Sequence, residues 1–258
     1  MITSFLMVGQ SNMAGRGNPA EVKRINHGGK LLMLRNCKWL GMAEPINYDR
    51  PFSGVSLAAS FAECAEAQLL ETDPEAQVGL IPAADGGSSM DQWHEGEILF
   101  DHACYLAELA SRTSEIKGIL WHQGEADCAP ALYSTYEERL TAMIEAMRKR
   151  LGMKDVPFLV GGLGDFLKDC PLSAQLANYV HVNDAMKAVA SKVKNVGFVS
   201  AEGLGSNDDF LHFNSKALRE FGIRYYEGYK ALVGRIDAEE KEAKIAIGGA
   251  ASTKMELL

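Results

Sequence analysis

Ser11 lies in a short polar turn that follows an apolar run. The run covers residues 2–8, and the turn continues as Gly9-Gln10-Ser11-Asn12-Met13-Ala14-Gly15. Open α/β sheets bind ligands beyond the carboxyl ends of their strands, so this position suits a nucleophile. Taken alone, the serine is more typical of a turn residue or a helix N-cap. It is also not a G-x-S-x-G elbow, because Met13 stands where that pattern has glycine.

An acid and a base lie close together near the other end of the chain. Asp209 and His212 are three residues apart in the segment DDFLHFN, after a glycine-rich polar stretch and before an amphipathic helix. In a turn, this spacing lets the carboxylate reach the imidazole and orient it as a general base. Asp208 could take the place of Asp209. The competing interpretation is a helix N-cap at Asp209 beside a surface histidine.

Several polar side chains follow the apolar residues 118–121, in the segment His122-Gln123-Gly124-Glu125-Ala126-Asp127. The Gln123 amide could donate a hydrogen bond to an oxyanion, as Asn and Gln side chains do in acyl-transfer enzymes. Glu125 and Asp127 could cap the following helix or hold Arg16 and other loop groups. The segment is not a usual zinc set, so no metal is expected.

A Gly86-Gly87 turn follows another apolar run, residues 77–81. One of these glycines could offer its backbone N–H to an oxyanion, because no side chain stands in the way. We expect Gly87 to be the donor, with Gly86 as the alternative. Trp93 follows this turn and could shape an aromatic pocket.

The composition is that of an ordinary globular protein. The chain has 258 residues, of which 47% are hydrophobic and 23% charged, and its net charge is −8. The basic residues do not cluster, which disfavours nucleic acid and anionic membranes as partners. Five scattered cysteines disfavour a disulfide framework. Neither a signal peptide nor a membrane span is expected, so a cytoplasmic location is predicted.

Apolar runs alternate with segments of helical period, which predicts an α/β fold, a three-layer α/β/α sandwich on a mostly parallel, flavodoxin-like sheet. Residues 36–53 are expected to form a long loop near the active face. We expect one domain over residues 1–238, followed by a tail, 239–258, that could be a strand, a dimer arm or a mobile end. The expected strands are 2–8, 31–34, 77–81, 118–121, 158–161 and 196–199, and the expected helices are 56–71, 98–114, 131–151, 172–191 and 215–233.

Four blocks in this order, GQSNMAG, GGSSMDQW, WHQGEAD and DxxHFN, together resemble the SGNH-hydrolase superfamily. More narrowly, they resemble its carbohydrate-esterase branch, the sialate O-acetylesterase and acetylxylan-esterase-related proteins. The resemblance implies Ser11 as nucleophile, His212 as base and Asp209 as its orienter. It also implies an oxyanion hole from the Ser11 N–H, a glycine N–H of the Gly86-Gly87 turn and the Gln123 side chain. Residues expected to support the site or contact substrate are Gln10, Asn12, Arg16, Gly86, Trp93 and Glu125.

The expected function is therefore removal of O-acetyl groups from a carbohydrate through an acetyl-enzyme on Ser11, without a cofactor. The expected partner is a small acetylated saccharide. The identity of the sugar and the oligomeric state, including a homo-oligomer, are left open by the sequence. Two alternatives are a lipase or thioesterase of the same superfamily and a catalytically silent sugar-binding protein.

Overall fold

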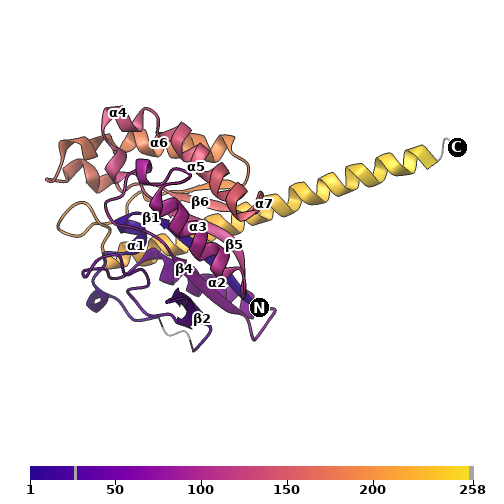
Figure 1. The fold of residues 1–258 in the computed structure, drawn as a ribbon, viewed down its shortest axis with the longest axis horizontal. Helices are drawn as coiled ribbons and strands as arrows, with labels where there is room; N and C mark the ends of the chain where they lie inside the picture. Colours follow the sequence, from indigo (N-terminus) through magenta and orange to yellow (C-terminus); the bar gives the residue numbers. More distant parts are fainter. Residues whose placement is uncertain (26–27, 256–258) are drawn as a thin grey trace.

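The computed structural model describes residues 1–25 and 28–255, with side chains up to residue 244. Within these ranges seven strands form one sheet in the order β3-β2-β4-β1-β5-β6-β7 (Figure 1). All neighbouring strands are parallel except β2 and β3. The strands are β1 (Ile2–Gly9), β2 (Leu31–Arg35), β3 (Lys38–Gly41), β4 (Gln77–Pro82), β5 (Ser114–His122), β6 (Phe158–Gly161) and β7 (Val196–Val199).

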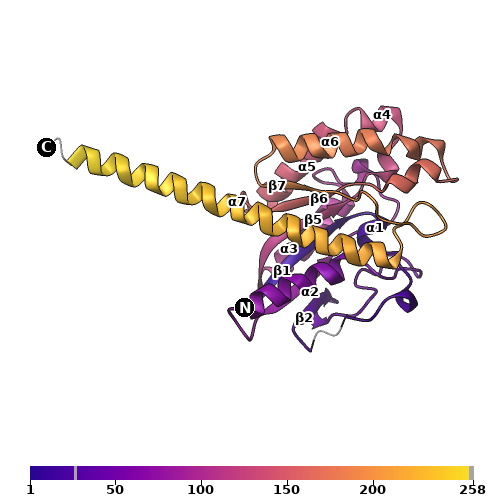
Figure 2. The ribbon, with the colours of Figure 1, turned by 180° about the vertical axis from the view of Figure 1, so that it is seen from behind.

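Helices cover both faces of the sheet, which confirms the predicted α/β/α sandwich. Helices α3 and α5 lie on one face, and α2 with the first half of α7 lies on the other (Figures 1 and 2). Helix α6 packs against α5 and β7. The helices are α1 (Ser11–Ala14), α2 (Leu57–Leu70), α3 (Ile98–Ala110), α4 (Pro130–Tyr133), α5 (Tyr136–Leu151), α6 (Tyr179–Lys192) and α7 (Ser215–Met255).

The six predicted strands are all present, but four predicted helices have clearly different limits, of which 215–233 is described separately below. Helix 98–114 ends at Ala110, because Ser114 already begins β5. Helix 131–151 is divided into α4 and α5, where the hydroxyls of Ser134 and Thr135 bond to preceding carbonyls and compete with helical hydrogen bonds. Helix 172–191 begins only at Tyr179, after a 3₁₀ segment, Ala174–Asn178, that the Ser173 hydroxyl caps.

The predicted loop 36–53 contains strand β3, which the sequence interpretation missed. Asn36 and Cys37 both have positive φ angles, 50° and 62°, and join β2 to β3 as a two-residue hairpin. Such a hairpin needs left-handed residues at both positions, and cysteine is not a usual signal for them. The rest of the segment forms loops, and Asp49 within it reaches the site described below.

Helix α7 continues well past the predicted end at residue 233 and projects from the body of the protein (Figures 1 and 2). The tail from residue 239, expected as a strand, a dimer arm or a mobile end, is thus helical to Met255, and residues 256–258 lie outside the described part. Charge pairs one turn apart, such as Glu240–Lys244, support a solvent-exposed helix. None of the helices within the described ranges, α7 included, is sufficiently long and apolar to cross a bilayer.

Helices α2 and α7 are in close contact at Gly222. A Cβ atom at this position would lie 2.0 Å from the Leu57 carbonyl oxygen and 2.2 Å from Ser60 Oγ. Ser60 Oγ in turn donates to the Arg219 carbonyl at 2.7 Å. The absence of a side chain at Gly222 therefore allows this helix pair to pack.

We predict that Gly222→Ala lowers the free energy of unfolding by about 1–3 kcal/mol, because the new methyl group overpacks the α2–α7 contact. Gly234→Ala is the matched control, since Gly234 lies in the same helix with open space around its Cα. Replacing a helical glycine with alanine there should stabilise the protein by up to about 1 kcal/mol. Urea unfolding measures both variants, and a shift of the same sign in both would contradict the packing argument.

Candidate active site

Ser11, His212 and Asp209 form a continuous chain of hydrogen bonds at the carboxyl edge of the sheet. His212 Nε2 lies 3.0 Å from Ser11 Oγ, and His212 Nδ1 lies 2.7 Å from Asp209 Oδ2. Ser11 begins α1 directly after β1, whereas the other two residues belong to the loop between β7 and α7. The structure thus brings together the three residues predicted as nucleophile, base and orienter, in the geometry that these roles require.

The backbone of its own loop holds Asp209 in place. Asp209 Oδ1 accepts hydrogen bonds from the Leu211 N–H at 2.9 Å and the His212 N–H at 3.0 Å. Burial favours the neutral acid, but these bonds and the bond from the His212 ring outweigh it and lower the pKa of Asp209 below its ordinary value of 3.8. Asp208, the alternative acid, is exposed to solvent, and the ring pairs with Asp209 instead.

Two backbone N–H groups near the nucleophile donate to no acceptor within the described residues. Ser11 is the first residue of α1, where N–H groups have no partner within the helix. The Gly86 N–H donates to Asp49 Oδ2 at 2.8 Å and is therefore occupied. Gly87 has a φ of 81°, and within the described residues its N–H donates to no acceptor. Of the two glycines, Gly87 is the one with a free donor.

The structure corrects the expectation that the Gln123 side chain donates to an oxyanion. Its side chain is fully buried, and its amide nitrogen donates to the Ser88 carbonyl at 3.1 Å and to Asp127 Oδ2 at 2.6 Å. Its amide oxygen accepts from the Tyr136 hydroxyl. Both amide hydrogens are thus committed inside the protein, so Gln123 braces the loop after β5 and has none left for a ligand.

Gln10, next to the nucleophile, has the free amide that Gln123 lacks. The side-chain oxygen of Gln10, Oε1, accepts from the N–H groups of Gly124 and Ala126, at 3.3 and 3.4 Å. Within the described part of the chain, its amide nitrogen donates to no residue, and Gln10 lines a pocket of about 320 Å³ together with Gly87 and Glu125. One end of this side chain is therefore anchored while the other faces the pocket.

Two of the residues expected to support the site or contact substrate do not line the pocket. Trp93 is fully buried, packs edge-on against Trp121 and donates to Ser88 Oγ, so it belongs to the core and does not line the pocket. Arg16 is 5% exposed at its side chain and pairs with Asp49 at 2.6 Å. It supports the site from below the surface.

Asp49 is a site residue that the sequence interpretation did not find. It connects Arg16 to the Gly86 N–H and also accepts from the Ser53 hydroxyl. Burial alone would raise the pKa of Asp49, but the bonds from Arg16 and Ser53 lower it below its ordinary value. An isolated aspartate in an irregular loop carries no sequence signal that would predict this role.

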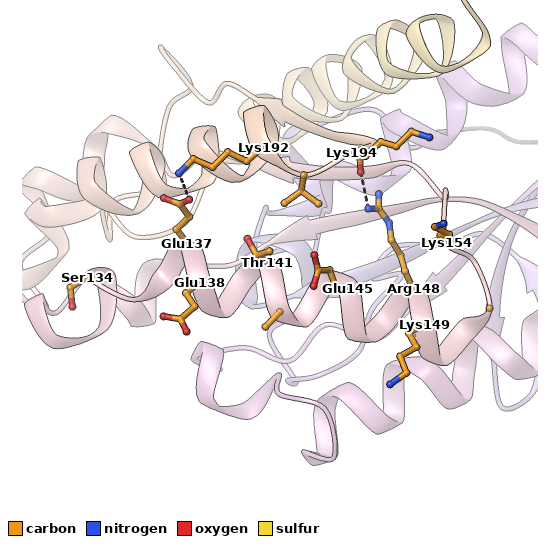
Figure 3. A pocket seen from close by; sticks show the side chains of 13 residues that line it. Ser134, Glu137, Glu138, Thr141, Glu145, Arg148, Lys149, Lys154, Lys192 and Lys194 are labelled. Atoms are coloured by element: carbon orange, nitrogen blue, oxygen red, sulfur yellow. Dashed lines mark hydrogen bonds and ion pairs between the residues drawn. The ribbon is translucent and has the colours of Figure 1, made fainter. Parts of the chain in front are cut away.

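A larger hollow, of about 1160 Å³, lies between α5 and the segment that joins α6 to β7 (Figure 3). Its walls are charged, but several of the charges are already engaged. Lys192 pairs with Glu137, and Arg148 donates to the Lys194 carbonyl at 2.8 Å. None of the three predicted catalytic residues lines this hollow. They do not line the smaller pocket either, but its lining includes Gln10 and Leu211, the sequence neighbours of Ser11 and His212, so the smaller pocket adjoins the candidate active site.

Among the residues that the structure describes, no group of three or more His, Cys, Asp or Glu side chains is arranged to hold a metal ion. His122, the histidine of the segment after β5, is fully buried, and its Nε2 lies 3.2 Å from the Gly162 carbonyl oxygen. Burial lowers the pKa of His122 despite the nearby Glu125 carboxylate. The ring is therefore a neutral core group that donates from Nε2.

Residues 2–231 match the family model described as carbohydrate esterase, sialic acid-specific acetylesterase. The chain belongs to this carbohydrate esterase family. The match confirms the resemblance to SGNH carbohydrate esterases, and it makes the protein an esterase of the carbohydrate class.

Individual relatives of this esterase agree with the family. A probable carbohydrate esterase of Arabidopsis thaliana is 26% identical, with 87% of this chain and 89% of that protein covered. The solved structure of an Arabidopsis thaliana protein, 25% identical, superposes with a TM-score of 0.77 over 89% of this chain and 98% of that one. Two further solved structures share the fold. NanS has a TM-score of 0.70 and 16% identity, with 91% of this chain and 98% of that one covered. A carbohydrate acetylesterase from Xanthomonas citri has a TM-score of 0.63 and 19% identity, with 89% of this chain and 56% of that one covered.

The stability of this esterase should carry a pH-dependent contribution from Asp209. Because its pKa is lower in the folded protein than the ordinary 3.8, that contribution is present above the ordinary value and is lost as the pH falls through the folded value. Asp209→Asn should therefore be less stable than the wild type near neutral pH, and the gap should close on acidification. Urea unfolding over a pH series measures it, with Asp208→Asn as the exposed control. A gap that stays constant with pH would contradict the assigned pKa direction.

Proposed function

We propose that this esterase removes acetyl groups from a saccharide through an acetyl-enzyme on Ser11. The observation that carries the proposal is the continuous hydrogen-bonded chain from Ser11 Oγ through His212 to Asp209. A serine hydroxyl is a weak nucleophile at neutral pH and needs an adjacent base, and that base needs an orienter. Both are present within hydrogen-bond distance.

The proposed reaction begins when His212 Nε2 takes the proton of Ser11 Oγ as this oxygen bonds to the acetyl carbonyl carbon. Asp209 stabilises the imidazolium that forms. The carbon–oxygen bond to the sugar then breaks, and His212 returns the proton to the sugar oxygen. Water next attacks the acetyl carbon, with its proton passing to His212. Ser11 Oγ leaves with that proton, and acetate is released.

The tetrahedral oxyanion is stabilised in this proposal by three donors. They are the N–H of Ser11, the N–H of Gly87 and the side-chain amide of Gln10, which takes the role first expected of Gln123. The support for this set is that all three donors are free, whereas Gly86 and Gln123 donate within the protein. Such donors act strongly because they are already oriented before the charge develops.

The proposed substrate is a small acetylated saccharide. The carbohydrate class follows from the family, and the predicted cytoplasmic location favours short saccharides over polymers. Acetate release from a panel of acetylated sugars would identify the sugar. A parallel series of esters from acetate to octanoate separates this function from that of a lipase or thioesterase, because only the latter should prefer the longer chains.

We predict that Ser11→Ala abolishes hydrolysis of p-nitrophenyl acetate, because no other group forms the acyl bond. The variant should keep the fold, which circular dichroism checks, since only one oxygen atom is removed. A serine-reactive phosphonate should label Ser11 in the wild type. Undiminished turnover by the variant, or an adduct on another serine, would refute the assignment.

We predict that Gln10→Glu lowers kcat for the same substrate by about 10²–10³, the loss typical of one oxyanion donor. The substitution keeps an oxygen that can accept from Gly124 and Ala126 but replaces the donor with a negative oxygen. Steady-state kinetics measures the effect, and Gln68→Glu, on the exposed face of α2, is the control for the added charge. A kcat equal to that of the wild type would exclude Gln10 from the oxyanion hole.

A further inference from the structure

One side chain, that of Asn12, contacts both residues that flank His212. Asn12 Nδ2 donates to the Leu211 carbonyl at 3.2 Å, and Asn12 Oδ1 accepts from the Phe213 N–H at 3.1 Å. Asn12 directly follows Ser11, although these partners lie about 200 positions away in the sequence. A single amide therefore connects the nucleophile segment to the backbone on either side of the base.

Glu125 supplies a further acceptor for this amide. Its Oε1 accepts from Asn12 Nδ2 at 2.5 Å, on the same side as the Leu211 carbonyl, which can only accept. Phe213 N–H can only donate, so this N–H and the Leu211 carbonyl together allow one orientation of the Asn12 amide. Asn12 is 1% exposed and Glu125 is 5% exposed, so water does not readily replace these bonds.

The other contacts of His212 and its loop orient the ring or anchor the loop in the core. Asp209 orients the His212 ring, but it belongs to the same loop and so does not place that loop relative to Ser11. The Phe213 side chain is fully buried against other aromatic rings and anchors the loop in the core. Asn207 donates from its side chain to the Arg16 carbonyl and from its backbone N–H to the His212 carbonyl at 2.8 Å, so it joins the base to a residue five positions after Ser11. Among the described contacts, Asn12 alone joins the neighbours of the base to the neighbour of the nucleophile.

We propose that Asn12 is a positioning residue that sets the distance between His212 Nε2 and Ser11 Oγ, and that Glu125 acts through it. The proposal rests on the proposed function, in which these two atoms exchange a proton. Displacing reacting groups by about 1 Å can cost about 10²-fold in rate. The Asn12 side chain therefore matters for kcat, because it joins the nucleophile segment to the two residues that flank the base and is not itself one of the free donors of the pocket.

The test measures kcat, KM and thermal unfolding for Asn12→Ala, Glu125→Ala, the double variant and Glu125→Gln, with p-nitrophenyl acetate as substrate. We expect Asn12→Ala to lower kcat by about 10²-fold with little change in KM. Because Glu125 acts through Asn12, the double variant should be no slower than Asn12→Ala alone. Glu125→Gln keeps an oxygen that can accept from Asn12, so it should recover most of the activity that Glu125→Ala loses.

Asn183→Ala is the matched control for a loss of folding stability. Asn183 makes the same pair of bonds, donating to the Leu163 carbonyl and accepting from the Leu163 N–H, but its partner is in another loop. The Asn183→Ala variant should lower the melting temperature, because two hydrogen bonds are lost. It should change kcat by less than about threefold, because these bonds do not involve the loop of His212. A kcat of Asn12→Ala no lower than that of Asn183→Ala, or additive losses in the double variant, would overturn the proposal.

The two proposals fail in different ways. If Ser11→Ala retains turnover, the proposed function itself is wrong. If Ser11→Ala is inactive and the phosphonate labels Ser11, but Asn12→Ala keeps the wild-type kcat, only the positioning role is overturned. The rate of phosphonate labelling gives a second readout, because it should fall in Asn12→Ala in parallel with kcat.

Discussion

The parallel pairing of β1 with both of its neighbours is the constraint on which the site depends. β1 lies between β4 and β5, and all but its first two residues are buried. The register aligns the ends of the strands, with Met7 opposite Pro82 on one side and Gly9 opposite His122 on the other. Three loops therefore leave the sheet at one edge, where they carry Ser11, the glycine turn and the polar segment after β5.

Most buried polar side chains around the nucleophile have hydrogen-bond partners, although single atoms of Arg16, His122, Glu125 and Arg139 have none within the described residues. Gln123 and Asp127 hold each other, and Arg139 pairs with Asp127 at 2.9 Å. Buried donors that lack partners are costly, so these contacts make the loop after β5 rigid. Gln10 and Gly87, which line the pocket, also have donors without an acceptor within the described residues. A rigid support with a few uncommitted donors is the arrangement that preorganised catalysis requires.

The two carboxylate contacts of the site also differ in burial. The Arg16–Asp49 pair is almost fully buried, with side-chain exposures of 5% and 3%. The His212–Asp209 pair is more exposed, at 17% and 39%. Removing one partner of a buried pair leaves an uncompensated charge, so the first pair holds its loops firmly together. The His212–Asp209 pair remains accessible to a substrate, and His212 Nε2 lies beside the hydroxyl of Ser11.

The sequence alone determined the alternation of strands and helices, the position of Ser11 after the first strand and the Asp209–His212 pair. Each of these depends on the period or spacing of residues that are close in the chain, so local physics is sufficient. Only the tertiary structure decided that Gln10 and not Gln123 has a free amide, that Trp93 is in the core and that Asp49 supports the site. The direction of an amide depends on donors and acceptors from distant segments, such as Ser88 and Tyr136 around Gln123. Those partners meet only when the sheet brings the ends of its strands together.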